Sequence, residues 1–378
     1  MRARAEVHWH EGLGLAVAVS HGASSAVLRH RSLGRVWSDA KPVEKFTSFN
    51  LLHRNSLLEN EPPTHGRLRR LVSTAFGRGH VERLRPWIAD LSDRLTDELC
   101  AKIADHGSAD VLQHVAGPLP VEVIAELLGV PVQDRALLQP WSNAIVKMYE
   151  YGLAEDRQRA AERAAEEFVA YLRDLVALRR KQPGDDLVSD LVSVTDTDGA
   201  KLTEDELVAT AVLLLMAGHE ATVNVIGNGV LALMRHQDQW RRLVADPSLL
   251  PSAVEELIRY DSPLQLFERT ATADVEIAGH VVREGDKIAA LLGAAARDPE
   301  VFDDPDAFDI GRSPNQHLGF GAGVHYCLGA PLARIEVEAA VGALARKLPG
   351  AVLAGEPRRR AEFVMRGLHE LPLTSSAG

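Results

Sequence analysis

At 378 residues the chain is long enough for about two or three domains, and its 46% hydrophobic and 25% charged residues are ordinary for a globular protein. The net charge of −11 disfavours nucleic acid as a partner, because the phosphate backbone would be repelled. The two cysteines, Cys100 and Cys327, provide no disulfide framework, which fits a reducing compartment. No apolar core segment precedes Gly12, so we expect no signal peptide and a cytoplasmic protein.

The first predicted elements are a weakly alternating strand over 15–20 and a short helix over 23–30. Pro62-Pro63 then marks the start of another helix, because proline is tolerated in the first turn. His65 and Arg69 lie four residues apart on this helix, so they share one face. Taken alone, such a pair is two solvated side chains.

Two long stretches, 81–130 and 134–182, are rich in alanine, leucine, arginine and glutamate and are predicted to be mostly helical. Glycine and proline residues break them into separate helices. Within 155–181 charged residues recur at helical spacing, which is typical of a solvated helix face. No internal repeat or low-complexity linker is present.

The most apolar part of the chain is a predicted helix over 203–235, which begins with a threonine cap and three acidic residues. Glu220 lies in its middle, where a charge would be costly in a membrane, so we predict a buried helix. His219-Glu220 is reminiscent of a zinc-protease motif, but Val223 stands where the second histidine belongs. A buried glutamate needs a function or a basic partner, and both remain open.

A further helix is predicted over 252–260, and Glu256 and Arg259 lie three residues apart on it. A lone Glu-x-x-Arg pair is common on helix surfaces. The segments 264–278 and 279–288 alternate between apolar and polar residues and are predicted to be strands.

The stretch 317–330 reads His-Leu-Gly-Phe-Gly-Ala-Gly-Val-His-Tyr-Cys-Leu-Gly-Ala, and a helix is predicted to follow over 331–347. Glycines let successive backbone N–H groups turn toward one anion, and a helix start adds partial positive charge. Both effects favour a thiolate at Cys327, which suits a metal ligand such as that of haem iron. The competing interpretation is a small buried cysteine that only packs.

The pattern Phe-Gly-x-Gly-x-His-x-Cys-x-Gly resembles the haem-binding signature of the cytochrome P-450 family, and further matches extend from about Gly14 to Leu373. The resemblance implies a mainly α fold with a smaller β portion (α+β) and haem b as cofactor, with Cys327 as metal ligand. It also implies a single haem domain over 1–378, with an unusually short N-terminal leader and no fused reductase domain.

Site residues follow from the resemblance position by position. The run that contains His65 and Arg69 looks like the family's propionate-binding helix, where two cations face two carboxylates. The implied cofactor-binding residues are His65, Arg69, Ala217, Gly218, Arg269, Phe320, Gly321, Gly323, His325, Cys327 and Gly329. The implied substrate-pocket residues are Leu264, Leu266, Phe267 and Met365. The implied structural residues, expected to form a buried ion network, are Glu256, Arg259 and Arg312.

The segment 217–222 resembles the family's distal helix, where an acid and an alcohol deliver protons to dioxygen. Glu220 matches the acid, but Ala221 occupies the alcohol position and the hydroxyl comes one residue later, at Thr222. Adjacent helix residues point about 100° apart, so Thr222 cannot simply replace the missing group. We therefore expect protons to arrive through Glu220 and ordered water, assisted by a hydroxyl on the substrate.

The implied reaction inserts one oxygen atom from O2 into a small to medium organic substrate, as in tailoring of specialised metabolites. Electrons would come from a separate ferredoxin and ferredoxin reductase, received on a basic patch that includes Arg67, Arg70 and Arg334. We expect a monomer that binds neither nucleic acid nor membrane. Two alternatives stay open: a peroxygenase-like or other non-hydroxylating oxidation, which Ala221 favours, and a non-catalytic haem sensor.

Overall fold

Two compact units make up the described chain. The structure is a computed structural model that describes residues 4–77, 79–150, 152–195 and 199–375. The first unit comprises Met1–Gly34, Trp87–Leu119 and Ala221–Gly378, and the second comprises Arg35–Pro86 and Pro120–Glu220. Two long helices, α4 (His80–His106) and α9 (Glu204–Arg235), contribute residues to both units.

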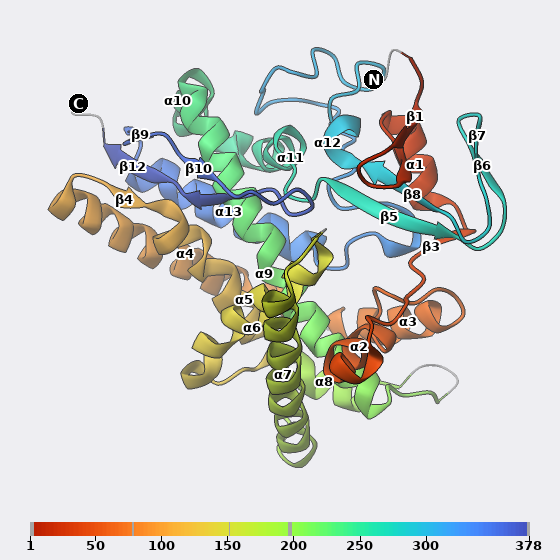
Figure 1. Ribbon diagram of the computed structural model, residues 1–378. Coiled ribbons are helices and arrows are strands. Elements are labelled where there is room, and N and C mark those ends of the chain that lie inside the picture. Colours follow the sequence, from red (N-terminus) through yellow and green to blue (C-terminus); the bar gives the residue numbers. More distant parts are fainter. Residues whose placement is uncertain (1–3, 78, 151, 196–198, 376–378) are drawn as a thin grey trace. The chain divides into compact units, whose positions relative to one another are not determined.

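The first unit contains a five-stranded sheet (Figure 1). Its strands lie in the order β1 (Val7–His10), β2 (Leu15–Ala18), β8 (Lys287–Leu291), β5 (Leu266–Ala271) and β3 (Leu33–Gly34). β2 and β8 run parallel, whereas the other neighbours are antiparallel. The sheet therefore joins the N-terminal segment to residues more than half the chain away.

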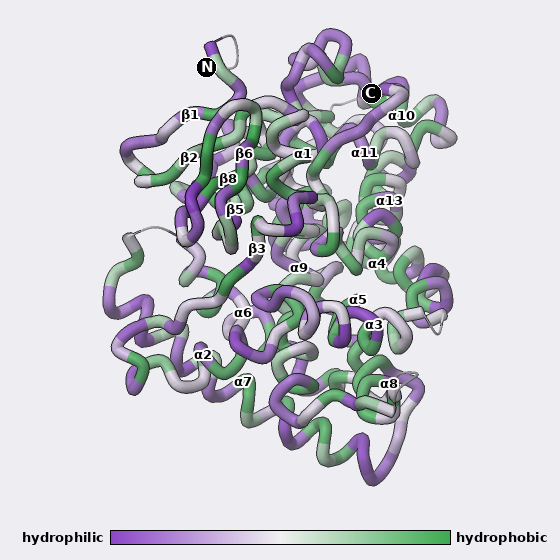
Figure 2. The backbone as a smooth tube through the Cα atoms, turned by 90° about the vertical axis from the view of Figure 1, so that its right-hand side faces the viewer, coloured by the Kyte–Doolittle hydropathy of each residue, from purple (hydrophilic) through white to green (hydrophobic). Residues whose placement is uncertain are grey.

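Hydrophobic residues cover both faces of this sheet. All four residues of β2 are buried, and β2 and most of β8 are coloured hydrophobic in Figure 2. Successive side chains of a strand point to opposite faces. Accordingly, Ala16 and Ala18 belong to one core cluster, whereas Leu15 and Val17 belong to another.

The predicted strand over 15–20 and helix over 23–30 are confirmed as β2 and α1 (His21–Arg29). The helix starts earlier than predicted because Ser20 caps it: the Ser20 Oγ accepts the Ala23 N–H at 3.0 Å. The predicted strand over 264–278 is in fact two strands, β5 and β6 (Val275–Ile277).

A tight hairpin joins β6 to β7 (His280–Val282). Its two turn residues, Ala278 and Gly279, have φ values of 46° and 78°. Both values are left-handed, as in the two-residue turns that match the twist of antiparallel strands. The turn lies where the two predicted strand segments, 264–278 and 279–288, meet.

The C-terminal part of the first unit adds two small sheets and several helices. One sheet has the order β4 (Ala109–Asp110), β12 (Pro372–Ser375) and β9 (Ala351–Leu353), and the other pairs β10 (Arg358–Arg359) with β11 (Leu368–Glu370). The helices are α10 (Gln237–Ala245), α11 (Leu250–Tyr260), α12 (Leu292–Ala295) and α13 (Ala330–Lys347). Helices α10 and α11 both pack against α13. Shorter helical turns span Leu112–Ala116, Pro247–Leu249 and Gly323–His325.

The second unit is helical. Its helices are α2 (Thr47–Arg54), α3 (Thr64–Phe76), most of α5 (Pro118–Leu128), α6 (Leu138–Val146), α7 (Glu155–Lys181) and α8 (Leu187–Ser193), with shorter turns at Val43–Lys45, Val132–Leu137 and Lys147–Tyr149. Helix α7 packs against α2, α6 and α8. On α7, Glu162 accepts the N–H groups of Ser48 and Phe49 at 2.8 and 3.0 Å. Glu162 therefore caps α2, so the predicted solvated face of α7 is wrong for this residue.

Helix α9 begins where the sequence predicts. The Thr203 Oγ1 accepts the Glu206 N–H at 3.2 Å, and Glu206 accepts the Thr203 N–H at 2.9 Å, which is a capping box. By length and composition this helix could cross a membrane, but 72% of its most apolar window is buried inside the protein. Its burial supports the prediction of a core helix.

Candidate functional site

A tightly turned loop carries Cys327. The Cys327 N–H donates to the carbonyl oxygen of Phe320 at 3.0 Å, which closes the loop. Gly321 and Gly323 have φ values of 72° and 70°, a region that favours glycine. A Cβ on Gly323 would also lie 2.6 Å from the backbone oxygen of Leu28. The glycines predicted from the sequence are thus required by the path of the loop.

Cys327 is half-buried and lies just before α13, whose N-cap is Gly329. The partial positive charge at the start of this 18-residue helix favours a thiolate. Within the described ranges no three His, Cys, Asp or Glu side chains form a metal site, so Cys327 offers a single sulfur donor. A Cβ on Gly329 would meet no atom within 4 Å, so space is open beside the helix start. One sulfur beside open space fits a haem, which brings its own nitrogen ligands.

Two further predicted cofactor residues lie in the same unit as Cys327. Arg269 on β5 is 3% exposed, and its Nη1 donates to the backbone oxygen of Glu268 at 2.8 Å. A buried guanidinium suits a carboxylate partner such as a haem propionate. His325 is half-buried in the short helical turn that precedes Cys327.

The predicted pair His65 and Arg69 lies one turn apart on α3, in the second unit. His65 is buried and Arg69 is half-buried. Arg67, two residues from each, forms an ion pair with Glu206 at the start of α9. Because Arg67 points to a different side of the helix, this ion pair fixes the rotation of α3 and with it the face that carries His65 and Arg69.

The middle of α9 has an accessible stripe of small residues on an otherwise buried helix. Ala217 is exposed, and Gly218 and Ala221 are half-buried. Ala217 and Ala221 lie four residues apart and share one side of the helix, whereas Gly218 lies about 100° round from Ala217. A Cβ on Gly218 would lie 2.8 Å from the Ile124 side chain, so α5 approaches closely here.

Next to this stripe three polar side chains are buried: His219 (1% exposed), Glu220 (7%) and Thr222 (4%). The His219 Nδ1–H donates to the backbone oxygen of Leu215 at 2.9 Å, and its Nε2 lies 3.6 Å from Glu220 Oε1. The predicted acid is therefore inside the protein beside an imidazole. Sequence reasoning weighed His219 only as a zinc ligand and missed this contact.

A cluster that sequence reasoning also missed surrounds Phe320. The Arg334 guanidinium lies 4.4 Å from the centre of the Phe320 ring and donates to both oxygens of Glu255, at 2.6 and 3.0 Å. His317 Nε2 lies 3.0 Å from the same carboxylate. Burial alone would raise the pKa of Glu255, but the hydrogen bonds from His317 and Arg334 outweigh it and lower this pKa to about 2. The cluster thereby holds the ring of Phe320, the residue whose carbonyl oxygen closes the Cys327 loop.

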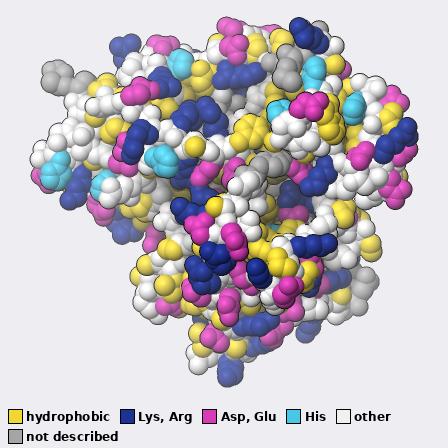
Figure 3. Space-filling view, viewed as in Figure 1, with side chains coloured by type: hydrophobic (Ala, Val, Ile, Leu, Met, Phe, Trp, Pro, Cys, Tyr) yellow, Lys and Arg dark blue, Asp and Glu magenta, His cyan; other side chains and the backbone are white. Residues whose placement is uncertain are grey.

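Two of the three residues of the predicted basic patch for a redox partner form ion pairs within the protein. Arg334 is bound to Glu255 and Arg67 to Glu206, so neither is an isolated surface cation. Of the three arginines in the predicted patch, only Arg70 is exposed. Basic and acidic side chains are interspersed on the face that Figure 3 presents.

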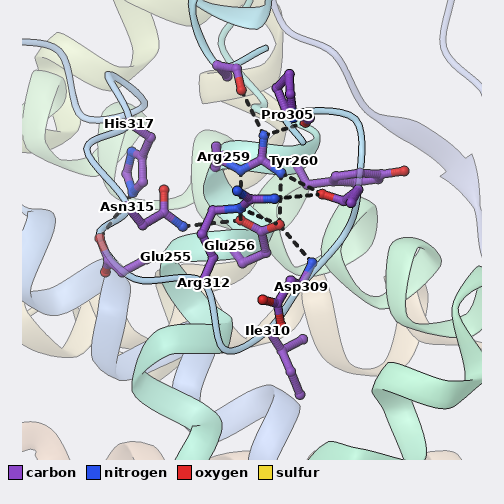
Figure 4. Close-up of polar contacts among 12 residues, drawn as sticks. Glu255, Glu256, Arg259, Tyr260, Pro305, Asp309, Ile310, Arg312, Asn315 and His317 are labelled. Carbon is purple, nitrogen blue, oxygen red and sulfur yellow. Dashed lines mark hydrogen bonds and ion pairs between the residues drawn. The ribbon is translucent and has the colours of Figure 1, made fainter. Parts of the chain in front are cut away.

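Glu256, Arg259 and Arg312 come together as a buried ion network (Figure 4). Glu256 accepts from Arg259 Nε at 2.7 Å, and its Oε2 lies 3.3 Å from Arg312 Nε. The same carboxylate accepts the Asp309 N–H at 2.9 Å and the Asn315 amide at 3.2 Å. The remaining N–H groups of Arg259 donate to the backbone oxygens of Ala296, Pro305 and Ala307. The network thereby fixes the loop after α12 against α11.

The four predicted pocket residues have different surroundings. Leu264 pairs with Met365 in an isolated β-bridge, so these two lie side by side and both are half-buried. Phe267 packs on the core cluster that includes Leu318 and Ala322 of the Cys327 loop. Leu266 is 3% exposed and belongs to the core cluster on the other face of the sheet. Its side chain packs with Leu15 and Val17 of β2, and its place in a pocket stays a prediction.

Comparisons with known proteins agree with this site. A family model described as Cytochrome P450 matches residues 25–247 and 243–352. The chain is 40% identical over 367 residues to the Cytochrome P450 monooxygenase PikC of Streptomyces venezuelae, a match that covers 96% of this chain and 86% of PikC. It is 42% identical over 319 residues to the 6-deoxyerythronolide B hydroxylase of Saccharopolyspora erythraea, covering 83% of this chain and 76% of that enzyme.

Among solved structures, P450BioI in complex with an acyl carrier protein that carries hexadec-9Z-enoic acid is similar, with a TM-score of 0.92 and 35% identity. The match covers 99% of this chain and 96% of that chain. The predicted mainly α fold with a smaller β portion is confirmed by this likeness and by the observed elements. Because the family model spans most of the sequence and a P450 relative is 40% identical over 96% of it, the chain belongs to the cytochrome P450 family.

Proposed function

We propose that this P450 monooxygenase oxidises a small to medium organic substrate of specialised metabolism, using haem b held by Cys327. The observation that carries the proposal is the closed glycine loop, which presents one half-buried sulfur at the start of α13. When bound, haem supplies the activation of O2, and thiolate ligation favours O–O cleavage. Relatives named as the 6-deoxyerythronolide B hydroxylase and the polyketide biosynthesis cytochrome P450 PksS support this substrate class.

The remaining roles belong to residues of this chain. Arg269 and His325 in the first unit, with His65 and Arg69 in the second, have the donor chemistry to bind two propionates. Ala217 and Gly218 present little side-chain volume, which leaves room for dioxygen. We propose that the chain works as a single haem domain.

Glu220 is the residue that we propose holds and passes the proton. Its carboxyl group is buried on α9, so its protons exchange with solvent only through ordered water or a neighbouring group. Ala221 provides no hydroxyl, and Thr222 points to another side of the helix. A hydroxyl on the substrate completes the relay.

Electrons are proposed to come from a separate ferredoxin and ferredoxin reductase, and the protein to act as a cytoplasmic, soluble monomer. The redox partner would dock on the side of α13 that carries the Cys327 loop. Because Arg334 is bound to Glu255, other basic residues would make the contact.

The reduced carbonyl spectrum tests the proposal. The full chain, loaded with haem, is expected to show the red-shifted band of sulfur ligation, and Cys327→Ala is expected to lose it. Cys100→Ala is the matched control, because Cys100 lies on α4 with its thiol near the backbone oxygen of Lys347, and it should leave the band unchanged. Protein that stays colourless, or a normal band in Cys327→Ala, would exclude the proposed function.

One competitor has an observation in its favour. Ala221 removes the alcohol of the usual proton relay, which suits an enzyme that turns over with peroxide alone. Product formed with peroxide, and none with ferredoxin, its reductase and O2, would establish the peroxygenase instead.

A further inference from the structure

Four polar side chains in the first unit join three separate parts of the chain; we refer to Asn228, Asp261, Arg359 and Arg366 as the hairpin latch. Asp261, directly after α11, receives Arg359 Nη2 on one carboxylate oxygen at 2.5 Å and Arg366 Nε on the other at 2.7 Å. Arg359 belongs to β10, and Arg366 lies in the turn between β10 and β11. Two guanidinium groups on one carboxylate hold this turn to the end of α11.

Asn228 connects the same groups to α9 and is 1% exposed. Its Nδ2 donates to the backbone oxygens of Arg366 at 3.0 Å and Asp261 at 3.3 Å, and its Oδ1 accepts from Arg359 Nη1 at 3.1 Å. A side-chain amide supplies both donors and an acceptor, which neither a carboxylate nor an apolar side chain can do. The latch therefore ties the hairpin to the helix that carries Glu220.

The latch also fixes the tip of the hairpin. The Arg366 N–H donates to the Pro263 oxygen at 2.8 Å, and the Gln265 N–H donates to the Val364 oxygen at 3.1 Å. Met365 forms the bridge to Leu264 between these two hydrogen bonds. The tip thus pairs antiparallel with the segment that leads into β5.

A glycine is needed beside the latch. A Cβ on Gly367 would lie 1.9 Å from the Oδ1 of Asn224, which precedes Asn228 by one turn of α9. The backbone of the hairpin therefore lies directly on the helix, and its position follows that of α9.

We propose that the hairpin latch positions Met365 and Leu264 as one wall of the substrate site and thereby sets which ligands bind. This proposal rests on the proposed function, because it needs a haem site with a substrate beside it. The latch residues act through the hairpin and touch no reacting atom, so they are positioning residues. A neighbouring ion pair, Arg358–Glu370, joins the two strands of the same hairpin at its exposed side and does not reach α9.

The test compares Arg359→Gln with Arg358→Gln, the same substitution one residue away, in the haem-loaded full chain. Hydrogen–deuterium exchange of the backbone N–H groups over 363–367 is measured first. Dissociation constants for imidazole and for 4-phenylimidazole are then measured from their absorbance shifts. Arg366→Gln is a second latch variant, since its side chain is 41% exposed and its loss is compatible with folding.

In Arg359→Gln and Arg366→Gln we expect exchange over 363–367 to rise about tenfold, because charge-assisted hydrogen bonds to Asp261 are lost. The dissociation constant for 4-phenylimidazole should rise by about threefold or more relative to that for imidazole, because only the phenyl group reaches the wall. Arg358→Gln should change neither quantity.

Equal behaviour of the latch variants and Arg358→Gln would overturn the proposal. So would faster exchange over 363–367 with an unchanged ratio of the two dissociation constants, which would leave the latch a purely structural role. If the unmodified protein gives no absorbance shift with either probe, the proposed function itself fails and the specificity role fails with it.

Discussion

The carboxyl group of Glu220 lies inside the protein one residue before Ala221, where the family places an alcohol. Ala221 is half-buried on the accessible stripe of α9, whereas Thr222 is buried on another side. At the scale of single residues, local sequence identifies which group is present, and burial decides where it can act. A hydroxyl at position 222 cannot serve a site that position 221 faces.

Ala221→Thr tests whether the substrate supplies the missing hydroxyl. With the native substrate we expect product formed per reducing equivalent to stay within about twofold of the unmodified enzyme, because the relay is already complete. Ala221→Val is the matched control, since valine has nearly the shape of threonine without its hydroxyl. A large gain in coupling for threonine and none for valine would show that the alanine is a defect and that the substrate does not assist.

At the scale of elements, the Cys327 loop and α13 form one structural arrangement. The loop needs two left-handed glycines to bring the sulfur to the helix start, and α1 approaches so closely that no side chain fits at Gly323. Arg334 on α13 forms an ion pair with Glu255 on α11, and its guanidinium contacts the Phe320 ring. This arrangement combines one local loop with contacts to α1 and α11, which are distant in the sequence.

Gly323→Ala is expected to lower the free energy of unfolding by about 2 kcal/mol or more, because alanine disfavours a positive φ and its Cβ would clash with the backbone of α1. Gly355→Ala is the control: its Cβ would meet only Pro372, at 3.9 Å. Urea unfolding of both variants measures the difference. Equal stability of the two variants would contradict the close approach at Gly323.

At the scale of the whole molecule, ion networks join segments that are far apart in the sequence. Glu256 fixes the loop after α12, Glu255 joins α11 to α13, and Asp261 holds the C-terminal hairpin. All three carboxylates lie within one short stretch around the end of α11. This stretch therefore organises the first unit, and the ionisation of Glu255 should contribute to stability toward acid.

The lowered pKa of Glu255 fixes the direction in which stability changes with pH. Its pKa falls from 4.5 to about 2 because the hydrogen bonds from His317 and Arg334 outweigh burial. A lowered pKa stabilises the folded state fully above 4.5, and this contribution is lost as the pH falls toward about 2. Denaturant unfolding at pH 7 and pH 3 should show Glu255→Gln clearly less stable than the unmodified protein at pH 7 and closer to it at pH 3.

Glu362→Gln is a control, since its carboxylate lies 3.8 Å from Arg360, farther than the 2.6 Å that separates Glu255 from Arg334. A stability difference for Glu255→Gln that does not depend on pH would mean that its carboxylate is not held ionised by its partners.

The sequence by itself determined the parts of this protein that depend on neighbouring residues. The glycine spacing around Cys327, the capping box of α9 and the turn at Ala278-Gly279 are local, because each involves residues a few positions apart. The fold class and the prediction of Cys327 as a metal ligand came from the family resemblance of this pattern, while the apolar residues of β5 could not be divided between core and pocket.

Only the tertiary structure decided the rest, because it depends on which distant segments meet. Leu266 packs in the core since residues of β2 and β8 lie beside it on the same face of the sheet, and Arg334 is not a free surface cation since α11 brings Glu255 to it. The hairpin latch joins residues as far apart as Asn228 and Arg366, and no local spacing marks them. Their contacts exist only once the chain has folded, because hydrogen bonds and ion pairs depend on distance in space.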